Sequence, residues 1–383
     1  ISLAPSTVYF YQVIAFSEGV ISNPLPGSQA TAAPGVVQST VVGGLWSAPS
    51  TWSGGVVPTA SDNVTILGGA TVTIDTAIAT PANALAIQVV TGSNLVYQDT
   101  PAAGLVVGTS VTVSAGSTFA SAAIGTTLTH SLSVGTDLIN NGTLDFSTNS
   151  NTAGAVITFT GATTGDSFGG VGPTTDVRSI IVNKGVSRLN TIELISTNFT
   201  VQGVNTDVAG FLTLINGTFK LSGSFSGTNR VFAIPAYVIP ANGGFWLNNA
   251  GYTVAGQNAS ATSSGLLRIS TGTFNIGTAT GNSMGFLAGS ATTVEGGAVN
   301  STGRFGVATS TNVISYTQTA GDVTVCTVGN ASTTLGSFDL GTSAASTILI
   351  SGGTINPQLQ ATTIDYRHQA GPGIAGVTAG TLR

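Results

Sequence analysis

The segment Ser270-Thr271-Gly272-Thr273-Phe274-Asn275-Ile276 decides the fold, because variants of it return further along the chain. The returns are Glu295-Gly296-Gly297-Ala298-Val299-Asn300, Thr319-Ala320-Gly321-Asp322-Val323-Thr324-Val325 and Ser351-Gly352-Gly353-Thr354-Ile355-Asn356. If Phe274, Val299, Val323 and Ile355 are equivalent, the spacings are 25, 24 and 32 residues. A period of a few tens of residues is typical of a solenoid of stacked coils. The longer last spacing predicts a loop inserted in that coil.

Outside this segment, the chain shows strand-like alternation and almost no helical periodicity. Val72-Thr73-Ile74, Val111-Thr112-Val113 and Phe219-Lys220-Leu221 are examples, and Gly, Asn and Ser clusters separate such runs. One coil cannot bury its apolar face alone, whereas stacked coils bury it jointly. We therefore predict an all-β protein dominated by a parallel β-helix, with repeats over residues 85–360 and a C-terminal end or linker over 361–383. Right-handed winding is the expected hand for parallel connections.

The low charge of the chain agrees with this fold and excludes several functions. Of 383 residues, 9 are Lys or Arg and 14 are Asp or Glu, whereas 42% are hydrophobic and 52 are Gly. Like charges stacked coil upon coil would repel one another. The chain has no basic stripe and no apolar run of about 20 residues, so we expect neither nucleic-acid binding nor membrane insertion. The single cysteine, Cys326, excludes an internal disulfide.

Residues 1–33 differ from the rest of the chain. Leu3, Pro5, Thr7, Tyr9, Tyr11, Val13 and Ala15 alternate strictly, and Gly19, Pro24 and a Pro/Ala/Gly-rich tail follow. This segment resembles the last two strands of a fibronectin type III β-sandwich, with Tyr9 in the place of the corner tyrosine of that family. The resemblance implies that residues 1–33 are the C-terminal strands and linker of such a domain. An ordinary hairpin at the mouth of the β-helix is the alternative.

The segment 36–84 is expected to open and cap the β-helix. It contains Gly44-Leu45-Trp46 and Thr51-Trp52-Ser53-Gly54-Gly55, and large aromatic rings can cover the open end of a solenoid. The segment resembles those that open β-helix domains in large secreted Bacteroidetes proteins. The alternative is that tryptophans contact carbohydrate, which makes Trp46, Trp52 and Trp246 candidate sugar-binding residues.

Carboxylates are too sparse to predict catalysis. β-Helix enzymes usually need several acidic side chains on one face, yet no Asp or Glu lies between Asp207 and Glu295. Two pairs lie about one coil apart and are candidate partners: Glu295 with Asp322, and Asp339 with Asp365. We expect no catalytic residue, no metal site and no cofactor. Asp62 and Asp75 flank a strand and offer a weak candidate site for Ca²⁺.

Taken together, these motifs resemble large repetitive surface proteins of gliding or biofilm-forming Bacteroidetes. The resemblance implies export by type IX secretion, a location on the outer cell surface, and surface glycans or other copies of the chain as partners. It also implies that Thr76, within Asp75-Thr76-Ala77, is a candidate site of O-glycosylation. The expected function is a non-catalytic structural or adhesive rod, able to form filaments. The alternative is a carbohydrate-binding or polysaccharide-cleaving β-helix protein.

Overall fold

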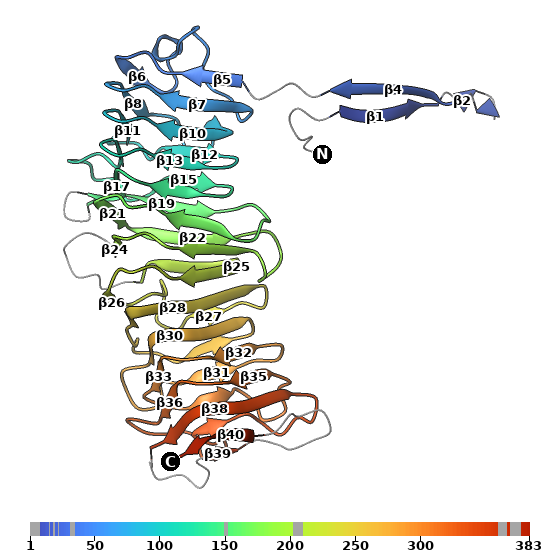
Figure 1. Cartoon of the computed structure of the whole chain (residues 1–383), viewed down its shortest axis with the longest axis vertical. Coiled ribbons are helices and arrows are strands. Elements are labelled where there is room, and N and C mark those ends of the chain that lie inside the picture. The colour runs from blue at the N-terminus through green and yellow to red at the C-terminus, as the bar shows by residue number, and fades with distance from the viewer. Residues whose placement is uncertain are drawn as a thin grey trace.

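The computed structural model is an all-β parallel solenoid of about 13 turns, as the repeats predict (Figure 1). It describes residues 8–14, 16–17, 20–21, 23–30, 35–148, 152–201, 210–358, 366–367 and 377–383. In this part of the chain the helical structure is a single 3-10 turn, η1 (Pro49–Thr51). The coils stack into a column in chain order, from β5 (Gly35–Gln38) to β40 (Val377–Leu382).

Each coil contributes strands to three faces of the column, and each face is a stack of parallel strands. Face 1 begins with β5 and comprises β7 (Asp62–Ile66), β10 (Ala86–Val89), β13 (Val111–Val113), β16 (Leu138–Asn140), β20 (Asp166–Gly169), β23 (Thr191–Leu194), β25 (Leu212–Leu221), β28 (Gly243–Val254), β30 (Leu266–Ile276), β32 (Ala291–Val294), β35 (Ser315–Gln318), β38 (Thr347–Pro357) and β40. The C-terminal parts of the long strands β28, β30 and β38 continue onto face 2, whereas the N-terminal part of β25 lies on face 3.

Face 2 is formed by the strands that follow on the next side of each coil. They are β6 (Gly43–Leu45), β8 (Thr71–Ile74), β11 (Asn94–Tyr97), β14 (Thr118–Ala120), β17 (Thr143–Asp145), β21 (Thr174–Val177), β24 (Thr200–Val201), β26 (Gly227–Asn229), β33 (Ala298–Ser301) and β36 (Asp322–Val325).

Face 3 closes each coil. It comprises β9 (Ala82–Ala84), β12 (Gly104–Val107), β15 (His130–Val134), β19 (Ala153–Phe159), β22 (Ser179–Asn183), β27 (Val238–Ile239), β29 (Ala261–Ser263), β31 (Met284–Phe286), β34 (Phe305–Val307), β37 (Phe338–Asp339) and β39 (Tyr366–Arg367), with the short β18 (Ser147–Thr148) antiparallel to β19.

The alternation of the strands builds the core, because inward side chains stack one coil above the next. Phe274, Val299, Val323 and Ile355 are in register on successive coils and buried, which confirms the predicted repeat. Burying such side chains contributes roughly 1.5–3 kcal/mol each before the entropy of ordering is subtracted. The repeated glycines form the corner of each coil that comes just before these residues in the sequence. Gly297 has φ +65°, and a Cβ there would lie 2.3 Å from the Gly272 carbonyl oxygen.

The longest spacing in the repeat marks an inserted loop, as predicted. Val323 and Ile355 occupy the same column. Between β36 and β37, residues 326–337 form no strand. Cys326 begins this loop; it is buried and free of disulfide bonds.

Residues 35–84 already contain coils as well as a cap. β5 and β7 pair in parallel, and so do β6 and β8. The turn around η1 brings Trp46 and Trp52 together at the N-terminal end of the column, with ring centroids 4.9 Å apart and an interplanar angle of 74°. At the other end, β39 and β40 extend the stack beyond residue 360.

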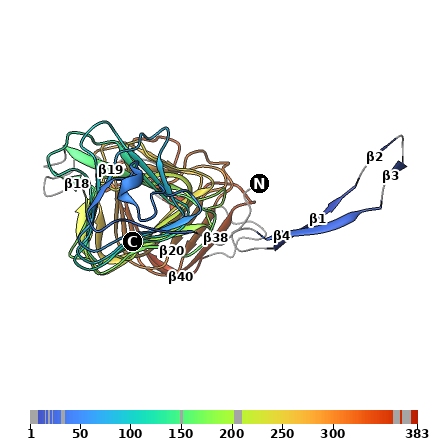
Figure 2. The ribbon, with the colours of Figure 1, turned by 90° about the horizontal axis from the view of Figure 1, so that it is seen from above.

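The described residues before the column form an antiparallel hairpin that stands away from it (Figure 2). β1 (Val8–Val13) pairs with β4 (Leu25–Ala30), and β2 (Phe16–Ser17) with β3 (Val20–Ile21). Phe10 is 84% exposed. Two strands alone are marginally stable.

Candidate functional site

Among the described residues, three groups of charged side chains each join different coils. The first is a ladder on the outer surface of face 1. Glu193, Lys220, Trp246 and Arg268 are in register on β23, β25, β28 and β30, and Glu295 follows β32. We call these five residues the outer ladder.

The outer ladder is closed by contacts on both sides of Trp246. The Lys220 Nζ lies 4.2 Å and the Arg268 Cζ 3.8 Å from the ring centroid. Because the two cations come from the strands on either side of β28, they cover opposite faces of the ring. Lys220 also pairs with Glu193 at 2.8 Å, and Arg268 pairs with Glu295 at 2.8 Å. Cation–π contacts of this kind contribute about 0.5–2 kcal/mol.

Hydrogen bonds complete the far end of the outer ladder. Trp246 Nε1 donates to the Ser270 hydroxyl at 2.8 Å, and this hydroxyl donates to Glu295 at 2.7 Å. Partial burial alone would raise the pKa of Glu295. Hydrogen bonds from Arg268 and Ser270, together with the charge of Arg268, outweigh burial and hold the pKa below its ordinary value.

This geometry corrects the interpretation of all three tryptophans as sugar-stacking residues. Trp46 and Trp52 are 1% and 2% exposed, so neither presents a face to a ligand. Trp52 Nε1 donates to the Trp46 carbonyl at 2.8 Å, which fixes the pair as an end cover of the core. Trp246 lies on the surface, but Lys220 and Arg268 occupy its two faces.

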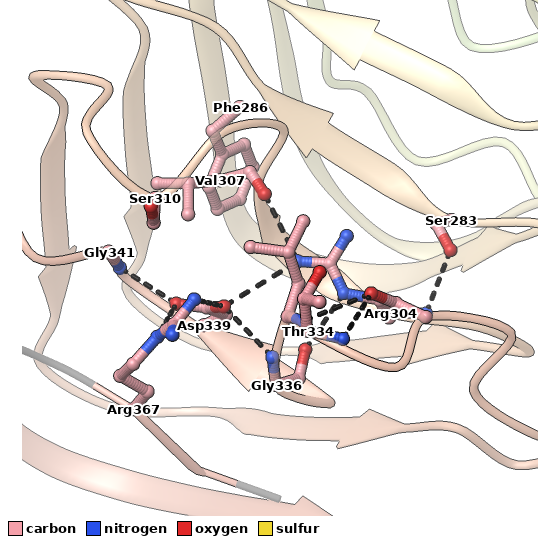
Figure 3. Close-up of polar contacts among 12 residues, drawn as sticks. Ser283, Phe286, Arg304, Val307, Ser310, Thr334, Gly336, Asp339, Gly341 and Arg367 are labelled. Carbon is pink, nitrogen blue, oxygen red and sulfur yellow. Dashed lines mark hydrogen bonds and ion pairs between the residues drawn. The ribbon is translucent and has the colours of Figure 1, made fainter. Parts of the chain in front are cut away.

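The second group surrounds Asp339, whose side chain is fully buried on face 3 (Figure 3). Arg367 donates to both carboxylate oxygens, at 3.0 and 2.6 Å. Arg304 Nη2 lies 3.7 Å from Oδ2. The backbone N–H groups of Gly336 and Gly341 each donate at 2.9 Å. We call Asp339 with Arg304 and Arg367 the buried triad; it ties three successive coils together.

Arg304 is held by backbone as well as by charge. Its Nε donates to the Gly336 carbonyl at 2.9 Å and its Nη2 to the Val307 carbonyl at 3.0 Å. Burial lowers the pKa of Arg304, and the carboxylate of Asp339 opposes that shift. The buried carboxylate of Asp339 is already bound by two guanidinium groups and two backbone N–H groups, so neither of its oxygens is available for catalysis.

Neither predicted carboxylate pair is shown to form. Asp322 is in register with Ala298, because this coil is 24 residues long and not 27, so Glu295 and Asp322 do not face each other. Glu295 instead binds Arg268 in the preceding coil. Asp365 lies outside the described residues, and Asp339 is in register with Arg367.

The third group is a buried ion pair between Lys184 and Asp166. The Lys184 side chain is fully buried, and its Nζ also donates to the Thr160 carbonyl at 2.9 Å. Such a pair is costly to bury and more costly to break, because either partner alone is an uncompensated charge.

The remaining predicted residues are engaged locally. The Thr76 hydroxyl donates to the Gly104 carbonyl at 3.2 Å and accepts from the Ala82 N–H at 2.7 Å, so a glycan there would displace both bonds. Asp62 accepts from Thr59 and Asp75 from Ser47. Within the described residues, no three of His, Cys, Asp and Glu gather in a way that could hold a metal ion.

Sequence reasoning missed one stacked pair of carboxylates. Asp145 on β17 and Asp176 on β21 are in register on adjacent coils of face 2. Burial raises the pKa of Asp145, opposed by the Ser147 N–H. Asp176 is 7% exposed and accepts from the Thr200 hydroxyl at 2.9 Å. The two residues lie 31 positions apart, and no repeat near them aligns them by sequence alone.

Comparison with family models, with curated proteins and with solved structures finds no match to this chain. In the described part of the chain, no helix is long and apolar enough to cross a membrane.

Proposed function

We propose that this chain is a structural and adhesive rod module of a secreted bacterial surface protein or fibre, and that it is not a catalyst. One observation carries the proposal: paired charges join one coil to the next instead of converging on a cleft. The outer ladder, the buried triad and the Lys184–Asp166 pair all have this arrangement. A chain whose few charged side chains join one coil to the next is suited to holding its shape.

The dimensions of the solenoid support a mechanical role. At about 4.8 Å per coil, about 13 turns give a rod roughly 60 Å long. Parallel strand pairs hydrogen-bond successive coils along the described part of the rod. A rod of this kind adds length and stiffness to a longer protein.

We also propose how the rod is exported, where it is located and what it binds. The resemblance to repetitive Bacteroidetes surface proteins supports type IX secretion, an outer-surface location and right-handed winding of the coils. The alternating strand β1 and its antiparallel partner β4 support a fibronectin type III origin for the hairpin. Surface glycans and other copies of the chain are the proposed partners, and nucleic acid is not.

Polysaccharide cleavage is the second candidate, because Asp145 and Asp176 stack on neighbouring strands. Retaining glycosidases use two carboxyl groups about 5–5.5 Å apart, one of them with a raised pKa. Asp145 has the raised pKa that an acid would need. We favour the rod, because Thr200 already binds Asp176.

Two measurements on the purified chain decide between these functions. Electron microscopy of single particles should show straight rods of constant width. A panel of neutral and acidic polysaccharides should show no turnover. Flexible or globular particles would contradict the rod. Turnover that is lost in both Asp145→Asn and Asp176→Asn, with the fold retained, would replace the rod by the enzyme.

A further inference from the structure

The two lysines of the chain each contact a carboxylate, but in opposite surroundings. Lys220 and Glu193, in the outer ladder, have side chains that are 18% and 30% exposed. Lys184 and Asp166 have side chains that are 0% and 9% exposed. Water therefore reaches the first pair and is excluded from the amino group of the second. A lysine that is kept from water and held against a carboxyl group is placed to react with it.

The buried pair lies at a corner of the column where two successive turns meet. Asp166 begins β20, Lys184 follows β22, and the two residues are 18 positions apart. The chain between them runs once along each of the three faces, through β20, β21 and β22. A covalent bond between the two side chains would therefore close one complete turn of the solenoid into a ring.

Lys184 is held in place by its backbone and by its side chain. Its N–H donates to the Asn216 carbonyl at 2.9 Å, and its carbonyl accepts from the Asn190 Nδ2 at 2.9 Å. Its Nζ donates to the Thr160 carbonyl at 2.9 Å and to the Asp166 Oδ2. The amino group is thus positioned before any reaction, which lowers the entropic cost of joining it to the carboxyl group.

The carboxyl group of Asp166 is positioned as well. Its Oδ2 accepts from the Thr163 hydroxyl at 2.6 Å in addition to the Lys184 Nζ. Because the Nζ contacts Oδ2, it lies at most one carbon–oxygen bond farther from the carboxyl carbon, the atom that an amine attacks. Well-oriented groups held this close reach effective molarities of roughly 10⁵–10⁸ M.

Burial also favours the product of such a reaction. In water, hydration stabilises an ammonium and a carboxylate and so opposes their condensation to an amide. Lys184 and Asp166 have given up most of that hydration, because their side chains are almost completely buried. An amide carries no charge, and its N–H can still donate to the Thr160 carbonyl that the ammonium now binds. Condensation therefore removes two buried charges and keeps this hydrogen bond.

We propose that Lys184 and Asp166 condense to an isopeptide bond, an amide between the two side chains. The ammonium passes a proton to the carboxylate, and the resulting amine attacks the carboxyl carbon. A carbon–nitrogen bond forms, a carbon–oxygen bond breaks, and the oxygen leaves as water with two protons that came from the nitrogen. The reaction needs no oxidant and no further reactant. It goes beyond the proposed function, because a rod with or without this bond can have the same shape and the same partners.

The mass of the denatured full chain tests for the bond directly. We expect it to be lower than the mass of the sequence by one water molecule. Digestion with trypsin and a protease that cleaves before Asp should release a branched product that joins residues 166–175 to residues 179–188. Trypsin should not cleave after Lys184, because it does not accept an acylated lysine. It should cleave after Lys220, the internal control for a lysine that contacts a carboxylate in water.

Two arginine variants complete the test. Lys184→Arg keeps a cation but removes the amine, so its denatured mass should equal that of its sequence. Lys220→Arg makes the same exchange at the exposed pair and should still show the loss of one water molecule. If Lys184→Arg does not fold, the digest of the wild type alone decides. The proposal is overturned if the wild type has its full mass, if trypsin cleaves it after Lys184, or if Lys184→Arg also loses water.

Discussion

The outer ladder and the buried triad use the same chemistry in opposite surroundings. Both join at least three coils through Arg and carboxylate groups, but Arg268 and Glu295 are about one-third exposed, whereas Asp339 is fully buried. Water screens the ladder and can replace any partner that is lost. In the buried triad, water cannot replace a lost partner in this way, because Asp339 is fully buried. The comparison therefore predicts that the same kind of substitution lowers the free energy of unfolding much more in the buried triad than in the outer ladder.

Removing the charge of Asp339 should have the largest effect. Asp339→Asn leaves Arg304 and Arg367 without a counter-charge, and it turns an amide group toward a site that supplies only donors. We expect a loss of about 3–5 kcal/mol in the stability of the C-terminal coils. Native-state hydrogen exchange of β34 and β37 measures it. Asp322→Asn, on an exposed position of β36, is the control and should stay within about 0.5 kcal/mol of wild type.

Removing the ring of Trp246 should cost less. Trp246→Ala deletes two cation–π contacts and the bond to Ser270, and we expect a loss of about 2 kcal/mol around β28. Trp246→Phe keeps the ring faces and should cost about half as much. Chemical denaturation of both variants provides the measurement. Equal losses in the two variants would show that the stacked cations contribute nothing.

His130 tests burial of a titratable group with no counter-charge in contact. Its Nδ1 accepts from the Ala103 N–H at 3.0 Å, its ring stacks on Tyr97, and no bond to its Nε2 is found among the described residues. Burial lowers its pKa, opposed by the charge of Asp99. The folded state therefore favours neutral His130, and this stability is lost as pH falls below about 6.5.

The variant His130→Phe separates this titration from others. The wild type should lose stability between pH 7.5 and pH 5 through this group, whereas His130→Phe should lose less over the same range. Thermal melting at the two pH values measures the difference. Parallel pH profiles for both proteins would contradict the assignment.

Neutralising Glu295 should have the smallest effect. The pKa of Glu295 is lowered in the folded state, so its contribution is present above its unfolded value of about 4.3 and is lost as pH falls through the folded value. Because Glu295 is partly exposed, Glu295→Gln should cost less than about 1 kcal/mol at pH 7, and less still in high salt. Melting at two salt concentrations tests this. A cost as large as that of Asp339→Asn would remove the distinction between the two clusters.

The sequence predicts the coils better than it predicts which charged residues meet in the outer ladder and the buried triad. Phe274, Val299, Val323 and Ile355 could be aligned because glycines mark the same corner in each coil. Residues 193, 220, 246, 268 and 295 of the outer ladder are separated by 27, 26, 22 and 27 positions. No constant period connects them, because the loops between strands vary in length. Asp145 and Asp176 escaped notice for the same reason.

The tryptophans show a second limit of sequence reasoning. Their number and type indicated ring stacking, and stacking does occur, but the partners are protein groups. Composition cannot say whether a ring faces a ligand, a cation or the core. That depends on which strand lies next to it, and register is set by the whole coil.

Pulling a single molecule from both ends of the solenoid tests its role as a rod most directly. We predict that coils detach one at a time, each releasing about 25 residues, or roughly 85 Å of chain. Coils joined by the outer ladder and the buried triad should require the highest forces, and Trp246→Ala should lower the force for the middle coils. Smooth extension without steps or resistance would contradict the proposal that this chain is a stiff structural module.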